Sequence, residues 1–311
     1  MRSYIRDRCP YKGISQIISN VFPNSHIRSL GILEGGKTNS NILVEIENCD
    51  DLFVLRHHLR GAEVCRKEVS LLQGLRDVLP VPELIAADVT GDKSGTTYLV
   101  YRYVPGHTFR EIRDRGSARD MADAAGAIGR SLSVLGNFKA SSLRDIGLLQ
   151  SFGICKDDFH SPLLREHLGV NDWLLLEELH AEWSSVLQNL PNDGALIHGD
   201  FNHRNIVLKN PTGTWEVACV LDWELASSGS FLWDAARFIC YERPDSEWWE
   251  DAFVDGLRTN SASIPDNWID LCRTLNTLSA ARSLANRSLQ EQFIQELKVL
   301  VRSGLRGKRV G

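Results

Sequence analysis

The feature that most constrains the fold is a change of hydrophobic pattern near residue 107. Before this point, short segments rich in β-branched and aromatic residues alternate with turn-forming residues, which indicates strands. Beyond it, apolar residues recur at the spacing typical of helices. We predict strands over residues 26–33, 41–47, 52–57, 83–89 and 96–103, and helices over residues 11–22, 62–77, 120–135, 172–190, 231–241, 246–258, 265–286 and 289–304.

These elements predict an α+β fold with two lobes. The N-terminal lobe, residues 1–104, is expected to be mostly antiparallel sheet plus one helix, and residues 105–311 are expected to form a larger helical lobe. At 311 residues the chain is long enough for two such lobes. A ligand cleft is expected where they meet.

Composition argues against several classes of protein. With 43% hydrophobic and 24% charged residues, the chain is typical of soluble globular proteins. Its net charge of -5 argues against a nucleic-acid partner, and no apolar run is long enough to span a membrane. The seven cysteines are scattered without a CxxC pair, which is typical of reduced thiols, and the first residues lack a secretory pattern. We therefore expect a cytoplasmic protein.

One short stretch, residues 196–208, combines two histidines, an aspartate and two asparagines between apolar flanks. Histidines invite a metal-hydrolase interpretation, but zinc proteases need two of them one helical turn apart. Here His198 and His203 are five residues apart, with Gly199 between them. A two-metal phosphatase would need further His and Asp clusters, which the chain lacks. Zinc or di-iron hydrolysis is therefore the weaker alternative.

The spacing fits phosphoryl transfer better. That chemistry needs a carboxylate near the acceptor hydroxyl and oxygen ligands for magnesium. In the kinase loop H-R-D-x-x-x-x-N, the magnesium-binding Asn follows the catalytic Asp by five residues, which is the spacing of Asp200 and Asn205. A predicted hairpin, residues 205–208 and 215–221, would return the chain to the same edge. Asp222 would there supply a second oxygen ligand, and Mg²⁺ needs few from the protein because it keeps waters and bridges phosphates.

The stretches "LIHGDFNHRN" and "VLDWELASSGSFLWDAARF" resemble two specific motifs of the aminoglycoside phosphotransferase and choline kinase-like family, relatives of protein kinases. The resemblance extends over most of the chain, from about residue 28 to about residue 240. It implies a two-lobed protein-kinase-like fold in which Asp200 is the catalytic carboxylate and Asn205 and Asp222 hold Mg²⁺. It also implies structural roles for His198, as a brace of the loop, and for Asp234, which would tie the following helix to it. A simple helix-start acid is the alternative for Asp234.

The nucleotide side is expected in the β-rich lobe. Residues 34–41 lie between two predicted strands, where small residues let backbone amides approach phosphates, although a double glycine is also common in a plain hairpin. The family has a similar loop that contains Gly and Asn at this place. The resemblance therefore implies nucleotide binding by Gly35, Gly36, Thr38 and Asn39.

Arg56, in "FVLRHH", takes the place of the usual kinase lysine, and the resemblance implies that arginine is tolerated there. Arginine stays charged and can chelate two phosphate oxygens, so α- and β-phosphate binding is expected to survive with a different geometry. Glu68, on the following helix, is its expected ion-pair partner, and a solvated helix acid is the alternative. The resemblance implies that the backbone of Arg102 and Val104, in the hinge, pairs with adenine.

The acceptor site is the part that the sequence specifies least. Residues 242–255, "ERPDSEWWEDAFVD", hold six acids and one arginine, and acidic walls attract cationic amines. The alternative is a solvated helix face with two packing tryptophans. Residues 150–170 show no clear periodicity and are a candidate cap for this site. The candidate acceptor residues are Glu224, Glu242, Asp245, Trp248 and Trp249.

These features together predict an ATP-dependent phosphotransferase that uses Mg²⁺ and moves the γ-phosphate to a hydroxyl of a small molecule, with GTP not excluded. The acceptor favoured by the resemblance is an aminoglycoside-type or other cationic antibiotic. One alternative is a kinase of a small metabolite such as an amino alcohol, a sugar or a glycated amine. A second is a catalytically idle nucleotide-binding module. The sequence does not decide between a monomer and a dimer.

Overall fold

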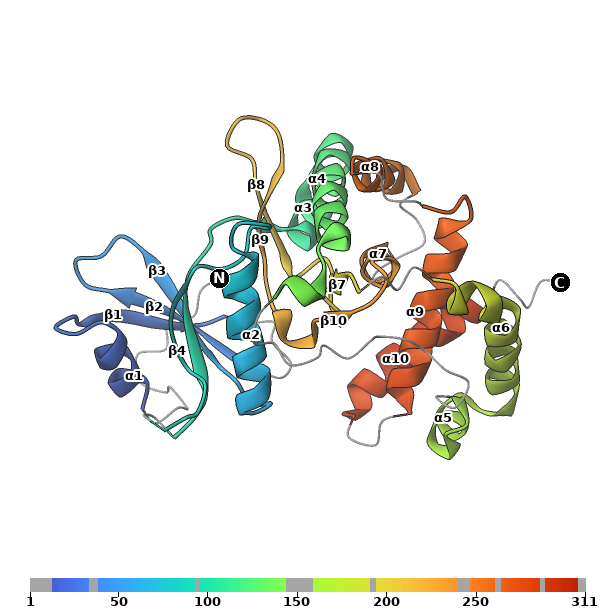
Figure 1. Cartoon of the computed structure of the whole chain (residues 1–311), viewed down its shortest axis with the longest axis horizontal. Helices are drawn as coiled ribbons and strands as arrows, with labels where there is room; N and C mark the ends of the chain where they lie inside the picture. Colours follow the sequence, from blue (N-terminus) through green and yellow to red (C-terminus); the bar gives the residue numbers. More distant parts are fainter. Residues whose placement is uncertain are drawn as a thin grey trace.

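The computed structural model describes residues 13–33, 39–92, 95–143, 159–190, 194–239, 247–260, 264–285 and 289–306 (Figure 1). A sheet with helices on its two faces forms the N-terminal lobe, and helices make up most of the larger lobe. The two-lobed α+β fold predicted from the sequence is therefore confirmed. Within the described part, no helix combines the length and the apolar character needed to cross a membrane.

The N-terminal sheet has two packed faces because side chains alternate along its strands. Its five antiparallel strands lie in the order β1-β2-β3-β5-β4. Phe53 and Leu55 in β3 pack in the cluster that contains helix α1, whereas Val54 between them packs in the cluster that contains helix α2. The bounds are α1 Ile14–Val21, β1 Ile27–Ile32, β2 Ser40–Ile46, β3 Leu52–His57, α2 Ala62–Leu75, β4 Leu84–Asp88 and β5 Tyr98–Arg102.

The larger lobe is built around two hydrophobic clusters. The first joins the sheet and α2 to helices α4, α7 and α8, so it runs through both lobes. The second holds α5, α6 and α10 against α9 at the end of the molecule away from the sheet (Figure 1). The bounds are α3 Phe109–Arg115, α4 Ala118–Asn137, α5 Pro162–Leu168, α6 Val170–Gln188, α7 Leu232–Ile239, α8 Glu247–Arg258, α9 Trp268–Leu284 and α10 Glu291–Leu305.

Helices α4 and α8 lie in backbone contact because glycines line both sides of the crossing. A Cβ atom added at Gly129 would lie 2.1 Å from the carbonyl oxygen of Phe253, and one added at Gly256 would lie 2.3 Å from that of Gly126. Only glycine allows so close an approach. The contact fixes α8, and with it Trp249, behind the loop of residues 198–205.

Short strands frame this central loop. Strand β7 (Leu196–Ile197) pairs with β10 (Ser227–Ser228), and β8 (Ile206–Lys209) lies between β6 (His107–Thr108) and β9 (Glu216–Val220). The predicted hairpin is thus present as β8 and β9. The loop begins and ends in fixed strands, and β9 returns the chain beside the end of the loop.

Two helices were missed by the sequence prediction. Helix α3 begins with a capping box, in which the Thr108 hydroxyl accepts the backbone N–H of Glu111 and the Glu111 carboxylate accepts that of Thr108. The T-x-x-E pattern is a sequence signal for such a start. Helix α5 lies within residues 150–170, where no periodicity is visible, and it begins with Pro162 in its first turn.

Candidate active site

The Asp200 carboxylate is held by donors on both oxygens. Nδ2 of Asn205 donates to Asp200 Oδ2 at 3.1 Å and to the Asp200 carbonyl oxygen at 3.0 Å. On the other side, Nε and Nη2 of Arg237 each lie 3.1 Å from Asp200 Oδ1. The Asp200 side chain is still 26% exposed. This carboxylate is both fixed and accessible, as a group that accepts a proton from a substrate must be.

His198 lies fully buried beneath the loop and connects its two ends. Its Nδ1 accepts the backbone N–H of Asp200 at 3.2 Å, and its Nε2 lies 2.9 Å from the carbonyl oxygen of Leu221. Because a carbonyl only accepts, these contacts assign the ring proton to Nε2. The ring thereby ties Asp200, which carries the carboxylate, to Leu221, which precedes Asp222, and this arrangement fits a brace.

Asp234, in the first turn of α7, secures the loop from the protein interior. Its carboxylate oxygens accept the backbone N–H groups of His198 at 2.6 Å and of Gly199 at 2.9 Å. Burial raises the pKa of Asp234 to about 6, although His198 and these N–H groups act in the opposite direction. Gly199 itself has a φ of +81°, and a Cβ atom there would lie 2.4 Å from the carbonyl oxygen of Leu225. The backbone conformation and the close packing at residue 199 therefore require the glycine in the H-G-D sequence, beside the histidine and aspartate that the chemistry requires.

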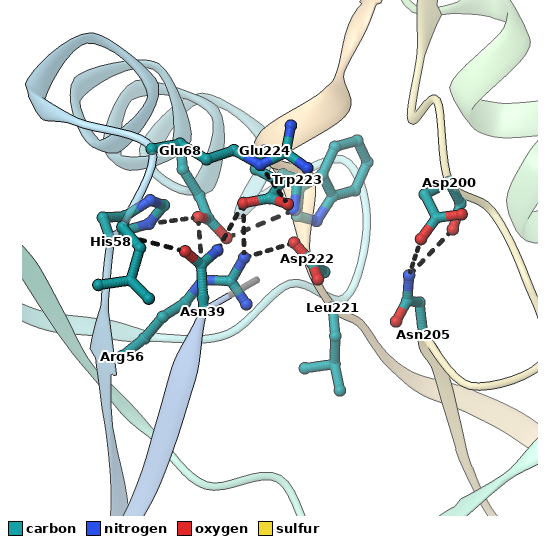
Figure 2. Close-up of polar contacts among 12 residues, drawn as sticks. Asn39, Arg56, His58, Glu68, Asp200, Asn205, Leu221, Asp222, Trp223 and Glu224 are labelled. Atoms are coloured by element: carbon teal, nitrogen blue, oxygen red, sulfur yellow. Dashed lines mark hydrogen bonds and ion pairs between the residues drawn. The ribbon is translucent and has the colours of Figure 1, made fainter. Parts of the chain in front are cut away.

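The hairpin brings Asp222 beside Asn205. The N–H of Leu221 donates to the carbonyl oxygen of Asn205 at 2.8 Å, directly after the paired part of β8 and β9. Asp222 follows in a left-handed conformation, with a φ of 66°, which turns the chain into the short helix Trp223–Leu225. Figure 2 shows Asp222 and Asn205 on either side of Leu221. Carboxylate and amide oxygens are the ligands that Mg²⁺ prefers, so this pair fits a magnesium site.

The two histidines of the loop do not fit a transition-metal site. His198 uses both ring nitrogens for protein groups, and His203 is buried, with Nε2 2.8 Å from the Phe238 carbonyl oxygen and Nδ1 3.3 Å from Nη1 of Arg113. Across the described ranges, no three His, Cys, Asp or Glu side chains gather in a way that would hold a metal ion. Both histidines are thus held by protein groups in the described structure.

Arg56 lies in a buried cluster of charges between the lobes (Figure 2). It follows Val54 by two residues, so the alternation along β3 directs it to the face that α2 covers. Its Nε lies 3.3 Å from Glu68 Oε2, which places the expected ion-pair partner in contact. Its Nη2 contacts Asp222 Oδ1 and lies 3.5 Å from Glu224 Oε2. One arginine therefore links a strand, a helix and the candidate magnesium ligand.

The charges of this cluster compensate one another. Burial is the largest influence on Arg56 and acts to lower its pKa, but the carboxylates of Glu68 and Asp222 raise it by more. For Glu68, burial acts to raise the pKa, but Arg56 and His58 together lower it below the ordinary value. His58 Nε2 lies 2.7 Å from Glu68 Oε2. Both Arg56 and Glu68 are therefore charged despite their burial.

Glu224 lies on the nucleotide side, which does not fit the acceptor role considered for it from the sequence. Its Oε2 accepts from Nδ2 of Asn39 at 2.5 Å, and its Oε1 lies 3.4 Å from Nε of Arg60 (Figure 2 shows the Asn39 contact). Burial is the main cause of a raised pKa of Glu224. Asn39 Oδ1 also accepts the N–H of Leu59, so Asn39 fixes the chain where the glycine loop ends. The other predicted loop residues lie outside the described residues: Gly35, Gly36 and Thr38.

The predicted hinge begins at the end of strand β5. The N–H of Arg102 donates to the carbonyl oxygen of Glu83 at 2.9 Å, and the N–H of Tyr103 donates to that of Leu52 at 2.8 Å. The Arg102 side chain pairs with two exposed acids at the surface. Val104 follows immediately, before β6 begins the larger lobe. Arg102 is thus the last residue of β5, and Val104 lies in the connection between the lobes.

Trp249 packs in the core instead of lining an open acceptor site. It is 1% exposed, and its ring centroid lies 5.5 Å from that of Phe109, 5.9 Å from that of His203 and 5.4 Å from that of Phe238. Its position follows from the close crossing of α8 over α4. Of the remaining acceptor candidates, Glu242 and Asp245 and the side chain of Trp248 lie outside the described residues.

Three residues of the site were missed by the sequence prediction. His58 follows Arg56 by two residues on the same strand edge, and this alternation is a signal that it meets the same helix. Arg60 reaches Glu224 from the turn that follows. Arg237 follows Asp234 by three residues, about one helical turn, so both face the central loop.

Comparison with known proteins places these features in context. Residues 29–266 match the family model described as "Phosphotransferase enzyme family". The chain is 30% identical over 233 residues to "Acyl-CoA dehydrogenase family member 11" of Gallus gallus, a match that covers 69% of this chain and 28% of that protein. The chain therefore spans less than a third of this relative.

Solved structures of similar fold extend over nearly the whole chain. The GDP complex of wild-type aminoglycoside 2'-phosphotransferase-IIIa has a TM-score of 0.66 at 19% identity and covers 94% of this chain and 98% of its own. The streptomycin–ATP–APH(2")-IIa ternary complex has a TM-score of 0.64 at 14% identity and covers 95% and 97%. At these identities the likeness establishes the fold.

Proposed function

The chain belongs to the phosphotransferase enzyme family, and on this premise we propose that it transfers the γ-phosphate of ATP to a hydroxyl group of a small molecule. The single observation that carries the proposal is the hydrogen-bonded pair of Asp200 and Asn205 at the hairpin, where the Leu221 N–H donates to the Asn205 carbonyl oxygen and Asp222 is the next residue. Phosphoryl transfer requires positioning and charge neutralisation and needs little covalent chemistry from the protein. A fixed carboxylate beside two oxygen ligands supplies what that reaction needs.

Asp200 is the proposed acceptor of the hydroxyl proton. As the hydroxyl oxygen bonds to the γ-phosphorus, the bond from that phosphorus to the bridging oxygen of the β-phosphate breaks and ADP leaves. The hydroxyl proton passes to the Asp200 carboxylate. Oδ2 is the oxygen that faces Asn205, so the hydroxyl would be oriented towards the side where the phosphates are held.

Asn205 and Asp222 are the proposed Mg²⁺ ligands. Because Nδ2 of Asn205 is turned towards Asp200, Oδ1 is the amide atom left to face a cation. Asp222 contributes a carboxylate that is 29% exposed. When bound, the cation would neutralise charge on the β- and γ-phosphates.

The remaining nucleotide contacts are proposed along the lobe boundary. Arg56 lies beside Asp222, so its guanidinium is placed to meet the α- and β-phosphates next to the cation. The N–H groups of Arg102 and Tyr103 are used within the sheet. The adenine edge would therefore meet the carbonyl of Arg102 and the N–H of Val104.

Mg²⁺-dependent nucleotide binding tests this assignment. Calorimetry with ATP in the presence and absence of Mg²⁺ is expected to show an affinity gain from the cation, and Asp222→Ala is expected to lose that gain. The same titration with GTP decides between the nucleotides. ADP formation is then measured over a panel of aminoglycosides, other antibiotics and hydroxylated metabolites. Nucleotide binding without turnover of any compound or of water would favour an idle nucleotide-binding module.

A further inference from the structure

An arginine shares the proposed catalytic carboxylate. Arg237 lies one turn after Asp234 on α7, which is held under the central loop by the bonds from Asp234 to the loop backbone. Both its Nε and its Nη2 lie 3.1 Å from Asp200 Oδ1. The side chains of Arg237 and Asp200 are 29% and 26% exposed, so a bound molecule can reach both.

This contact divides the two oxygens of Asp200 between two donors. Arg237 holds Oδ1, and Asn205 holds Oδ2 from the side of the proposed cation. A carboxylate held at both oxygens has little freedom to rotate, so its orientation is set before a substrate arrives. Arg237 therefore acts on the base and is placed to orient it.

The same arginine sets the charge beside the reacting hydroxyl. An acceptor that donates its hydroxyl to Asp200 must bring its neighbouring groups close to the Arg237 guanidinium. As the hydroxyl proton passes to Asp200, the negative charge of that carboxylate is lost while the positive charge of Arg237 remains. At this stage of the reaction a neighbouring ammonium group is repelled and a carboxylate or phosphate group is attracted.

Building on the proposed function, we propose that Arg237 positions Asp200 and selects acceptors in which the group beside the reacting hydroxyl is neutral or negatively charged. An ammonium group at that place is excluded. This assignment differs from the cationic acceptor expected from the acidic residues 242–255. It rests on the geometry of Asp200, Asn205 and Arg237.

The test uses alcohols in matched pairs that differ in charge at one end: glycerate and 3-aminopropane-1,2-diol, 3-hydroxybutyrate and 4-aminobutan-2-ol, and gluconate and glucamine. ADP formation is measured for the whole wild-type chain, for Arg237→Gln and for Arg237→Lys. Arg76→Gln, which removes an exposed arginine after α2, is the matched control. Hydrolysis of ATP without an added alcohol is measured in parallel, because water then serves as the acceptor.

The wild-type chain is expected to use the carboxylate member of a pair in preference to the ammonium member. Arg237→Gln should lower kcat/KM for that carboxylate by about ten- to a hundredfold, the loss expected when a hydrogen bond to a charged group is removed, and should shift the ratio towards the ammonium member. It should also lower kcat for ATP hydrolysis without changing KM for Mg-ATP. Arg237→Lys should keep the charge preference and recover part of kcat, whereas Arg76→Gln should behave as wild type.

Several results would overturn this role of Arg237. They are a wild-type preference for the ammonium compounds, stimulation by none of the carboxylates, or an unchanged charge ratio and hydrolysis rate in Arg237→Gln. A wild-type chain that neither binds nor hydrolyses Mg-ATP would instead overturn the proposed function. The two failures are therefore distinguishable.

Discussion

Two arginine–carboxylate pairs flank the candidate site, and they differ in burial and in the number of their partners. The Arg56 side chain is 4% exposed and meets Glu68, Asp222 and Glu224 between the lobes. The Arg237 side chain is 29% exposed and meets Asp200 at an accessible carboxylate. A buried charge is tolerated only when it is paired, whereas a partly exposed pair adds little stability and stays accessible to water or substrate. The pair on the proposed nucleotide side thus supports the fold, and the pair on the proposed acceptor side is placed to meet a bound molecule.

The largest expected effect on the free energy of unfolding follows from removing Arg56 from its buried pair with Glu68. Arg56→Gln would leave the buried Glu68 carboxylate without its arginine partner, so the free energy of unfolding should fall by about 3–5 kcal/mol. Urea unfolding followed by circular dichroism measures this change. Arg56→Lys, which keeps a charge but loses the planar fork, is the matched control and should lose less. A loss below about 1 kcal/mol in Arg56→Gln would mean that the cluster is not a stabilising pair.

A smaller effect on the free energy of unfolding is expected from Asp234, a buried carboxylate without an arginine partner in the described part of the chain. Within the described part, Asp234 accepts backbone N–H groups and forms no ion pair with Lys or Arg, and burial raises its pKa to about 6 from the ordinary 3.8. The raised pKa means that its contribution to stability is complete below pH 3.8 and is lost as the pH rises through about 6. The loss is on the order of 3 kcal/mol.

Asp234→Asn isolates this contribution, because the amide does not ionise. The free energy of unfolding of wild type and of Asp234→Asn is measured from about pH 3.5 to about pH 7, a range that spans the ordinary and the raised pKa of Asp234. As the pH rises, wild type should lose stability relative to Asp234→Asn. A difference that does not vary with pH would contradict the raised pKa. Glu68, equally buried, has its pKa lowered by Arg56 and His58, so a cationic neighbour decides the direction of the shift.

The smallest expected effect on stability is that of the exposed pair. Arg237→Gln should change the free energy of unfolding by about 0–1 kcal/mol, because a partly exposed ion pair gains little over hydration. Thermal unfolding at equal protein concentration measures it. A loss as large as that of Arg56→Gln would show that the two pairs do not differ in the way described, and that Arg237 is part of the framework of the fold.

The difference between the proposed nucleotide side and the proposed acceptor side also explains which features could be predicted from the sequence. The lobes and their strands follow from local periodicity, and Asp200, Asn205 and Asp222 follow from a fixed spacing within one loop and one hairpin. The contact between Arg56 and Glu68 was predicted from the family resemblance, which places a cation on this strand and an acid on the following helix. These features depend on residues close together in sequence.

The acceptor side depends on contacts that no local pattern encodes. Arg237 reaches Asp200 only because Asp234 holds α7 under the loop, and Trp249 is buried only because glycines let α8 approach α4. The sequence left open whether the W-W pair of residues 248 and 249 lines an acceptor site or packs, and Trp249 packs in the core. Glu224 likewise follows Asp222 in sequence, but its contacts with Asn39 and Arg60 arise from the packing of the lobes.

The most direct test of the central claim is Asp200→Asn. The substitution keeps the shape of the side chain but removes the charge that accepts the hydroxyl proton. We expect kcat for phosphate transfer, to water or to an alcohol, to fall by about 10²–10⁴-fold while the calorimetric affinity for Mg-ATP stays unchanged. A purified, folded Asp200→Asn protein with near wild-type turnover would contradict the assignment of Asp200 as the base.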